Sequence, residues 1–231
     1  MAPAMSGLSR TAKMTPRKAA RHERILDVAC RLTGLHGHDG VSMRTIAAES
    51  GTTEKTLYNV YGSKNRLIAT AARERSAKLF EAAVGAAPEG GWPMLRTFAR
   101  MAAELTLADP PMARALATVL LEHSELVGLE SVYEGRVALA LEQMAEAGDL
   151  DPNYPHALLI RLIRLGVTAA VLFWSKAELS DGELEPYIST RIVETLLPYV
   201  PASRQKPLRD LLDSACKELA VARQSIASTD L

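Results

Sequence analysis

The sequence predicts an all-α protein, and three observations support that fold class. Apolar residues recur every three to four positions along most of the chain, which is the spacing of one helix face. Alanine and leucine are abundant, while aromatic residues make up only 5% of the 231 residues, a composition that favours helices over sheets. No segment alternates convincingly between apolar and polar residues, so no strand is expected.

The N-terminal stretch combines a polar arm with a first helix. Residues 1–20 are polar and basic and contain Pro3 and Pro16, which predicts a disordered arm. A helix is expected from 17 to about 35, because apolar side chains recur there at helical spacing until several glycines end the pattern.

A tight corner between two short helices follows in the segment SMRTIAAESGTTEKTLYNVYGSK, which starts at Ser42. Ser42 is the predicted N-cap of a helix over 43–50, and Gly51 ends that helix. Thr53 is the predicted N-cap of the second short helix, about 54–60.

A third, longer helix is expected after Ser63, and it runs towards Pro88. The stretch at 87–93, rich in glycine and proline, then marks a domain boundary. Apolar stripes at helical spacing continue beyond it, so the second domain is also predicted to be helical. These stripes cover 92–105, 112–123, 137–144, 155–178, 188–199 and 208–222, with a turn expected at 178–186.

Charge is divided unevenly along a chain whose formal net charge is zero. Residues 1–75 carry 13 Lys and Arg against 6 Asp and Glu, a net charge of +7, and the remainder carries −7. A basic N-terminal module suits an anionic partner, although a helical surface that happens to be basic is the alternative. The predicted divisions are a basic arm (1–20), a domain that holds the corner (21–86), a second helical domain (87–226) and a tail (227–231).

The corner has the features of a helix-turn-helix, whose second helix lies in the major groove of DNA. Ile46 and Ala47 are the inward positions of the first helix, and Gly51 can adopt a positive φ at the turn. Leu57 is the one large aliphatic residue inside the second helix, so it is expected to anchor that helix. The positions that can point outward are polar, as is expected of a face that DNA covers: Thr53, Glu54, Lys55, Thr56, Tyr58 and Asn59.

The same residues resemble a known family. The segment SMRTIAAESGTTEKTLYNVYGSKNRLI is similar to the DNA-binding segment of the TetR family of bacterial one-component regulators. The shared pattern is a Ser/Thr before the first helix, Ile-Ala, a glycine turn, Thr-Leu-Tyr in the recognition helix, then an aromatic residue, Ser-Lys and a leucine. The resemblance is specific over about residues 42–68 and extends over 22–70.

The resemblance implies a role for each matching residue. Hydroxyls and backbone amides at the two helix N-termini would bind phosphates, and the exposed face of the recognition helix would contact base edges. Tyr58 would contact a phosphate, Lys64 would clamp the backbone, and Asn59 suits a bidentate contact to adenine. The implied DNA-binding residues are Ser42, Arg44, Thr53, Lys55, Thr56, Tyr58, Asn59 and Lys64.

Three positions depart from the family pattern and leave the operator sequence open. Glu54 stands where a basic or small residue is common, Thr52 replaces an aliphatic residue, and Asn65 replaces a capping glutamate. Glu54 also favours the alternative function, a helical ligand-binding or scaffold protein with a vestigial helix-turn-helix. The cations of the N-terminal arm would either enter a minor groove or serve as a solubilising tail. These are Arg10, Lys13, Arg17, Lys18 and Arg21.

The family resemblance implies that the C-terminal domain dimerises and binds a small effector. The helix over 156–178 is apolar nearly all round, which indicates burial against its own domain and against a second subunit. With the helix over 184–199 it is expected to form a homodimer interface; a central helix of a monomer is the alternative. The expected function is a transcriptional repressor that a small apolar ligand releases from its double-stranded DNA operator.

The effector site is predicted from adaptable apolar side chains and a few polar ones. The negative charge of the domain favours a neutral or cationic effector over an anionic one. The candidate ligand-binding residues are Met101, Leu105, Met112, Leu116, Leu120, His123, Tyr133, Val137 and Trp174.

Other function classes have little support in the sequence. No nucleophile elbow or phosphate-binding loop is present, so neither an enzyme nor a cofactor is predicted. The segment GLHGHDG at 34–40 has no second ligand cluster, and no metal site is expected. Arg161 and Arg164 interrupt the most apolar stretch, which argues against a membrane span. A cytoplasmic location is expected, because the two cysteines form no disulfide framework and the N-terminus lacks an apolar signal region.

Overall fold

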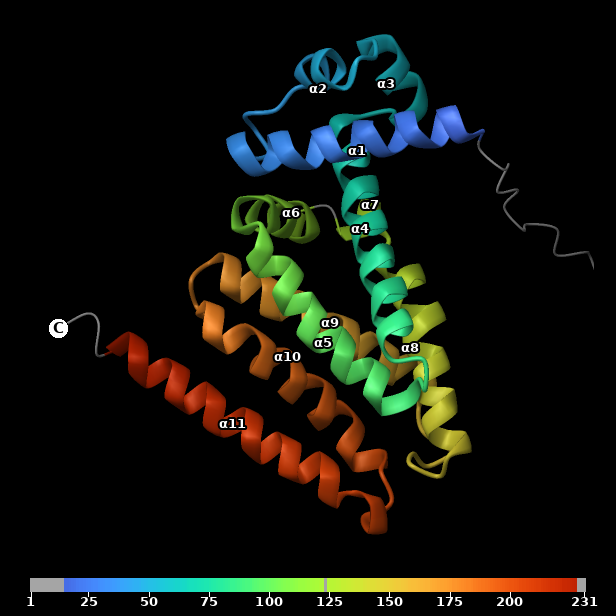
Figure 1. The fold of residues 1–231 in the computed structure, drawn as a ribbon, viewed down its shortest axis with the longest axis vertical. Helices are drawn as coiled ribbons and strands as arrows, with labels where there is room; N and C mark the ends of the chain where they lie inside the picture. Colours follow the sequence, from blue (N-terminus) through green and yellow to red (C-terminus); the bar gives the residue numbers. More distant parts are fainter. Residues whose placement is uncertain (1–14, 123, 228–231) are drawn as a thin grey trace, which may run out of the picture.

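The all-α prediction is confirmed in the computed structural model, which describes residues 15–122 and 124–227 (Figure 1). Within those ranges every regular element is a helix. The N-terminal part holds α1 (Pro16–His36), α2 (Met43–Ser50), α3 (Glu54–Tyr61) and α4 (Lys64–Ala86). The C-terminal part holds α5 (Gly91–Ala108), α6 (Pro110–Glu122), α7 (Ser124–Val127), α8 (Leu129–Glu146), α9 (His156–Ser175), α10 (Asp181–Leu196), the 3-10 turns η1 (Leu197–Tyr199) and η2 (Ala202–Arg204), and α11 (Lys206–Ala227).

The caps that begin the short helices are those that the sequence predicts. The hydroxyls of Ser42, Thr53 and Ser63 each accept a hydrogen bond, 3.1–3.2 Å long, from the backbone amide three residues further on. An N-cap of this kind stabilises a helix by about 1 kcal/mol. Gly51 ends α2 with a φ of 68°, in the left-handed region where a side chain would be strained.

The helices pack around two hydrophobic cores, and α4 contributes to both. Leu67 and Ala71 of α4 join the core formed with α1, α2 and α3. Ile68 and Ala72, one position further along, join the core of the C-terminal domain. Figure 1 shows α4 running from beneath α1 down into the C-terminal domain. Because one rigid helix carries both cores, a shift of α4 in one domain must move the other.

Stacked aromatic rings mark the centre of the larger core. Phe80 of α4 stacks on Phe98 of α5 with ring centroids 4.0 Å apart. Tyr133 of α8 meets Phe80 edge-on at 4.8 Å and Phe98 edge-on at 5.8 Å. The three rings therefore join α4 to α5 and α8 in the preferred stacked and T-shaped arrangements.

Two predicted boundaries are wrong. Helix α1 begins at Pro16, so residues 16–20 are helical and do not belong to a disordered arm; a proline suits the first turn of a helix because its missing N–H is not needed there. Helix α10 begins at Asp181 within the predicted turn, because Ser180 and Glu183 form a capping box. Pro186 lies inside this helix, where it removes one backbone hydrogen bond.

Helix α9 is long and apolar enough, by length and composition, to cross a membrane. In the structure it packs against α6, α8 and α10 through one buried face. Its opposite side leaves Leu158, Leu162, Leu165 and Phe173 between 40 and 47% exposed. These four residues recur at helical spacing and form what we term the α9 stripe.

Candidate nucleic-acid interface

The corner between α2 and α3 is built as the sequence predicts. Ile46, Ala47 and Leu57 are buried, and Leu57 has no exposed surface. The amide of Thr52 donates to the carbonyl of Ala47 at 3.0 Å, which closes the turn around Gly51. Leu57 therefore anchors α3 from beneath, and the rest of that short helix projects outward.

The outward face of α3 carries side chains that are free to bind a partner. Lys55, Tyr58 and Asn59 are exposed on α3, and Arg44 is exposed on the neighbouring α2. None of these four side chains has a hydrogen bond or an ion pair with the residues that the structure describes. A cation, an amide and a phenol on one helix face suit phosphate and base-edge contacts. Val60, 57% exposed, adds an apolar surface on the same helix that the sequence analysis did not single out.

Three of the predicted contact residues have structural roles at the helix starts. The hydroxyl oxygens of Thr53 and Thr56 lie 2.8 Å apart, and Ser42 makes the same contact with Thr45 at 2.8 Å. Each cap uses one lone pair of its hydroxyl, and the remaining first-turn amides stay available for an anion.

Glu54 is the first residue of α3 and is exposed. A carboxylate in the first turn stabilises the helix through the positive end of its dipole. Helix stabilisation therefore accounts for this departure from the family pattern.

Lys64 lies in a different setting from the exposed cations. Its ammonium group donates to the backbone carbonyl of His38 at 2.7 Å and is half-buried. The Nε2 atom of His38 lies 3.0 Å from Oδ1 of Asn65, so the loop after α1 is fixed to the start of α4. The contact with His38 accounts for the presence of Asn65 in place of the family's capping glutamate. Lys64 would contact a phosphate, as predicted, through the ammonium protons that do not donate to His38.

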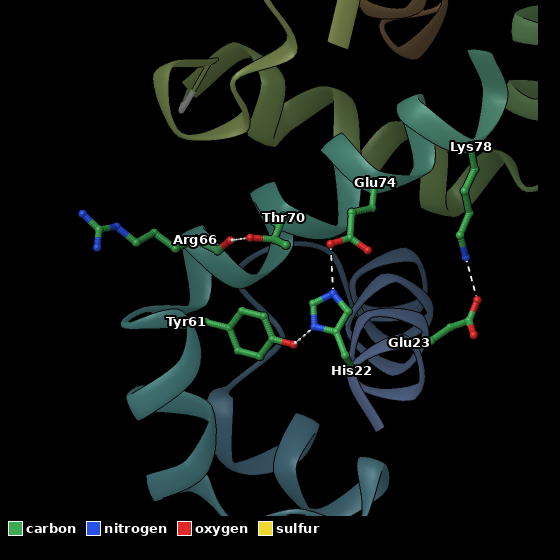
Figure 2. A network of polar contacts seen from close by, with 7 residues as sticks. All are labelled: His22, Glu23, Tyr61, Arg66, Thr70, Glu74 and Lys78. Carbon is green, nitrogen blue, oxygen red and sulfur yellow. Dashed lines mark hydrogen bonds and ion pairs between the residues drawn. The ribbon is translucent and has the colours of Figure 1, made fainter. Parts of the chain in front are cut away.

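A polar network that the sequence analysis did not identify fixes the far end of α3 (Figure 2). The hydroxyl of Tyr61 lies 2.9 Å from Nδ1 of His22 on α1. The Nε2 atom of the same imidazole lies 2.9 Å from Oε1 of Glu74 on α4. In a neutral imidazole Nε2–H donates to the carboxylate and Nδ1 accepts from the phenol. The network thus joins α1, α3 and α4, and its only sequence signal is Tyr61, the aromatic residue of the family pattern.

Burial fixes the protonation state of Tyr61 in this network. Burial, followed by the charge of Glu74, raises the pKa of Tyr61 to about 12, so its hydroxyl remains protonated near neutral pH. Beside it, Lys78 of α4 donates to Glu23 of α1 at 2.7 Å, and this hydrogen bond lowers the pKa of the Glu23 carboxyl. The contact between His22 and Glu74 and the contact between Glu23 and Lys78 both join α1 to α4.

The residues predicted to bind an effector separate into several places. Leu105, Leu116, Leu120 and Tyr133 line a cavity of about 100 Å³ between α4, α5, α6, α8 and α9. Met101 and Met112 line a larger groove, about 1250 Å³, between α1, α4, α5 and α6.

Two more of the predicted effector residues, Trp174 and Val137, do not line this cavity. Trp174 lies apart from it, where its Nε1–H donates to Asp181 at 2.8 Å and its ring lies under Arg114. Val137 is part of the packed core. His123 falls outside the described residues. Helical spacing does not show which side of a buried helix faces a cavity, so the predicted set mixed cavity, groove and core positions.

The described residues contain no group of three or more His, Cys, Asp and Glu that could hold a metal ion. In the segment after α1, His38 instead contacts Asp39, with 3.1 Å between Nδ1 and Oδ1. That imidazole also contacts Asn65, so it fixes the loop to the start of α4.

Fold and site together define a helix-turn-helix DNA-binding protein with a separate helical C-terminal domain. Residues 25–71 match the model of bacterial regulatory proteins, tetR family, and no curated protein matches the chain. With FadR of Thermus thermophilus, a TetR-family transcriptional repressor, the TM-score is 0.61 at 20% identity, over 75% of this chain and 92% of that one. With FadR of Bacillus subtilis the TM-score is 0.62 at 15% identity, and the match covers 76% of this chain and 97% of that chain. With SmeT of Stenotrophomonas maltophilia the TM-score is 0.56 at 18% identity, and the match covers 79% of this chain and 92% of that chain.

Residues 25–71 thus match the DNA-binding segment of the tetR family, and the solved structures share the fold over most of the chain. The resemblance that the recognition-helix residues suggested is therefore confirmed, and the protein is a DNA-binding transcriptional regulator.

Proposed function

We propose that this regulator is a homodimeric repressor that leaves its operator when a small apolar ligand occupies the C-terminal domain. The exposed face of α3, formed by Lys55, Tyr58 and Asn59, is the observation that supports DNA recognition most directly. As a regulator of transcription the protein acts in the cytoplasm and needs no catalytic residue or cofactor.

The α9 stripe supports dimerisation. Four large apolar side chains exposed along one helix face form a patch of the kind that marks a protein interface. On the neighbouring α10, Tyr187 meets Phe173 edge-on at 6.5 Å, which continues the apolar surface. Two copies that pair through α9 and α10 would form a four-helix interface and place two α3 helices on successive major grooves.

The apolar cavity supports an effector. Two related folds were solved with acyl-CoA ligands, lauroyl-CoA in FadR of Thermus thermophilus and stearoyl-CoA in FadR of Bacillus subtilis. SmeT is the repressor of a multidrug efflux pump. In this chain the cavity lining is mainly apolar, which suits a ligand with a substantial hydrocarbon part.

Helix α4 supplies the connection between effector and DNA. It lines the cavity through Phe80 and Leu79, and its first turn packs beneath the helix-turn-helix. A ligand that favours another position of α4 would change the spacing of the two recognition helices. Ligand and DNA would then weaken one another's binding by a common factor.

Selection of bound fragments from the source genome tests this proposal. The expected product is a pseudo-palindromic site whose half-sites lie one or more helical turns apart. In gel shifts on that site, Asn59→Ala is expected to change which sequences are bound, because Asn59 would contact a base edge. Tyr58→Phe is expected to weaken binding to all sequences alike, because its hydroxyl would contact a phosphate. A uniform loss of affinity with Asn59→Ala would contradict the assignment of that residue.

A further inference from the structure

Arg75, on the middle of α4, lies in a setting unusual for a cation. Its guanidinium donates from Nη1 to the sulfur of Met112 at 3.0 Å and from Nη2 to the carbonyl of Leu105 at 3.0 Å. No carboxylate among the described residues forms an ion pair with it, and the adjacent Glu74 is bonded to His22. A thioether is a weak acceptor. A half-buried positive charge thus lacks the anionic partner that such charges usually have.

The same side chain stands between two hollows. Arg75, Leu79 and Leu105 line the cavity of about 100 Å³ and also the groove of about 1250 Å³ on its other side. The cavity alone is smaller than the roughly 300–1,000 Å³ of typical ligand sites. A ligand with a long apolar part therefore needs the space that movement of this partition would open.

The polar groups that face the cavity leave few partners for a ligand. Ser76, Thr106 and Thr168 each donate their hydroxyl to a carbonyl of their own helix. The hydroxyl of Tyr133 makes no hydrogen bond with the described residues. Among the described lining residues, Arg75 carries the one charge. The cavity thus combines apolar walls with a single cationic donor and one phenol.

We propose that Arg75 binds the carboxylate head of an amphipathic effector whose apolar chain lies in the cavity against Phe80, Phe98 and Leu116. The inference rests on the proposed function and narrows its ligand class. A carboxylate accepts both guanidinium donors in a bidentate pair, which is stronger than the bonds to a thioether and a carbonyl. Carboxylates outnumber the other cations on the groove side and would disfavour the head there. The carboxylates are those of Glu23, Asp27, Glu74, Glu104 and Asp109, and the cations are Arg24, Arg31 and Lys78.

Binding of a carboxylate to Arg75 would also change the contacts that α4 makes with the C-terminal domain. The present contacts of the guanidinium tie α4 to the end of α5 at Leu105 and to the start of α6 at Met112. A carboxylate that draws the guanidinium away releases both ties at once. The helix that carries the DNA-binding domain then loses two polar contacts with the C-terminal domain.

Three ligands with the same ten-carbon chain test the inference: decanoate, decanol and decylammonium. Their affinities for the full-length protein are measured by calorimetry. The wild type is expected to prefer decanoate over decanol by about tenfold or more, the range for a hydrogen bond to a charged group. Arg75→Gln is expected to abolish this preference, and Arg75→Glu to favour decylammonium. Arg73→Gln, an exposed arginine of the same helix, is the matched control and should keep the wild-type order.

The outcomes separate this inference from the proposed function. Equal affinities of the wild type for decanoate and decanol, a preference that survives Arg75→Gln, or failure of all three ligands to bind would each overturn the role of Arg75. Duplex binding without ligand, measured on the same samples, tests the regulator itself. Arg75→Lys keeps the charge and guards against misfolding; it should retain part of the preference for decanoate.

Discussion

Gly34 of α1 lies against the backbone of Met112 at the start of α6. A Cβ on Gly34 would lie 2.9 Å from the amide nitrogen of Met112 and 3.0 Å from its Cα. The same amide donates to Oδ1 of Asp109 at 3.2 Å, so the start of α6 has little freedom to retreat. The DNA-binding and C-terminal domains thus meet through direct backbone packing, which only glycine permits at this position.

Gly34→Ala is expected to destabilise the protein by about 1–3 kcal/mol, the usual cost of overpacking. Chemical denaturation measures the change. Gly85→Ala, on an exposed part of α4 with no atom within 4 Å of the added Cβ, is the matched control. It should stabilise by about 0.5–1 kcal/mol, because alanine favours a helix. Equal effects of the two substitutions would show that the contact between α1 and α6 does not constrain the domains.

Tyr61→Phe and Tyr58→Phe are expected to have opposite effects on stability and on DNA binding. Tyr61→Phe removes the hydrogen bond to His22 and should lower the free energy of unfolding by about 1 kcal/mol. Tyr58→Phe should leave stability unchanged, because its hydroxyl has no partner among the described residues, and should weaken DNA binding. Thermal melts and gel shifts of both variants measure these effects. A loss of stability in Tyr58→Phe as large as that in Tyr61→Phe would contradict the roles assigned to the two tyrosines.

Charges placed in the α9 stripe are expected to produce monomers. Leu162→Glu with Leu165→Glu would bury two carboxylates at the proposed interface, which costs several kcal/mol. Sedimentation should show the mass of one chain, and operator affinity should fall at least tenfold, because each half-site contributes little alone. Leu35→Glu, at an exposed leucine 63% accessible on α1, is the control and should remain a dimer.

Cys30 provides a prediction of pH dependence. Burial, and to a lesser extent the charges of Asp27 and Asp109, raise the pKa of this thiol from 9.0 to about 11, while Arg75 opposes the shift. The folded state therefore favours the neutral thiol, so the stabilisation is complete below pH 9 and is lost as the pH rises to 11. Over that window the wild type should lose roughly 2 kcal/mol more stability than Cys30→Ala, since each pKa unit corresponds to 1.36 kcal/mol. Equal losses would place the thiol in a solvated site.

Local signals in the sequence predicted the DNA-binding half well. Ser42, Thr53 and Ser63 are caps, Gly51 turns the chain and Leu57 anchors α3, because caps, turns and anchors depend on neighbouring residues. The network of His22, Tyr61 and Glu74 joins helices far apart in the sequence. No spacing rule brings those three side chains together.

The effector region was predicted less well, for a physical reason. Arg75 belongs to the helix that was assigned to the basic N-terminal domain, yet its guanidinium faces the cavity of the other domain. Net charge per domain therefore pointed to a neutral or cationic effector, whereas the local charge at the cavity is positive. Because α4 contributes residues to both cores, dividing the chain at one sequence position does not assign each of its charges to the correct domain.

The salt dependence of duplex binding tests the central claim, that the exposed face of α3 binds DNA. Association with a random duplex is measured by anisotropy between low and physiological ionic strength. We expect the logarithm of the association constant to fall linearly with that of the salt concentration, with a slope of about −0.9 per neutralised phosphate. Arg44→Gln and Lys55→Gln should each make the slope shallower by about 1. Absence of binding to any duplex at low ionic strength would contradict the claim and leave the vestigial helix-turn-helix as the better account.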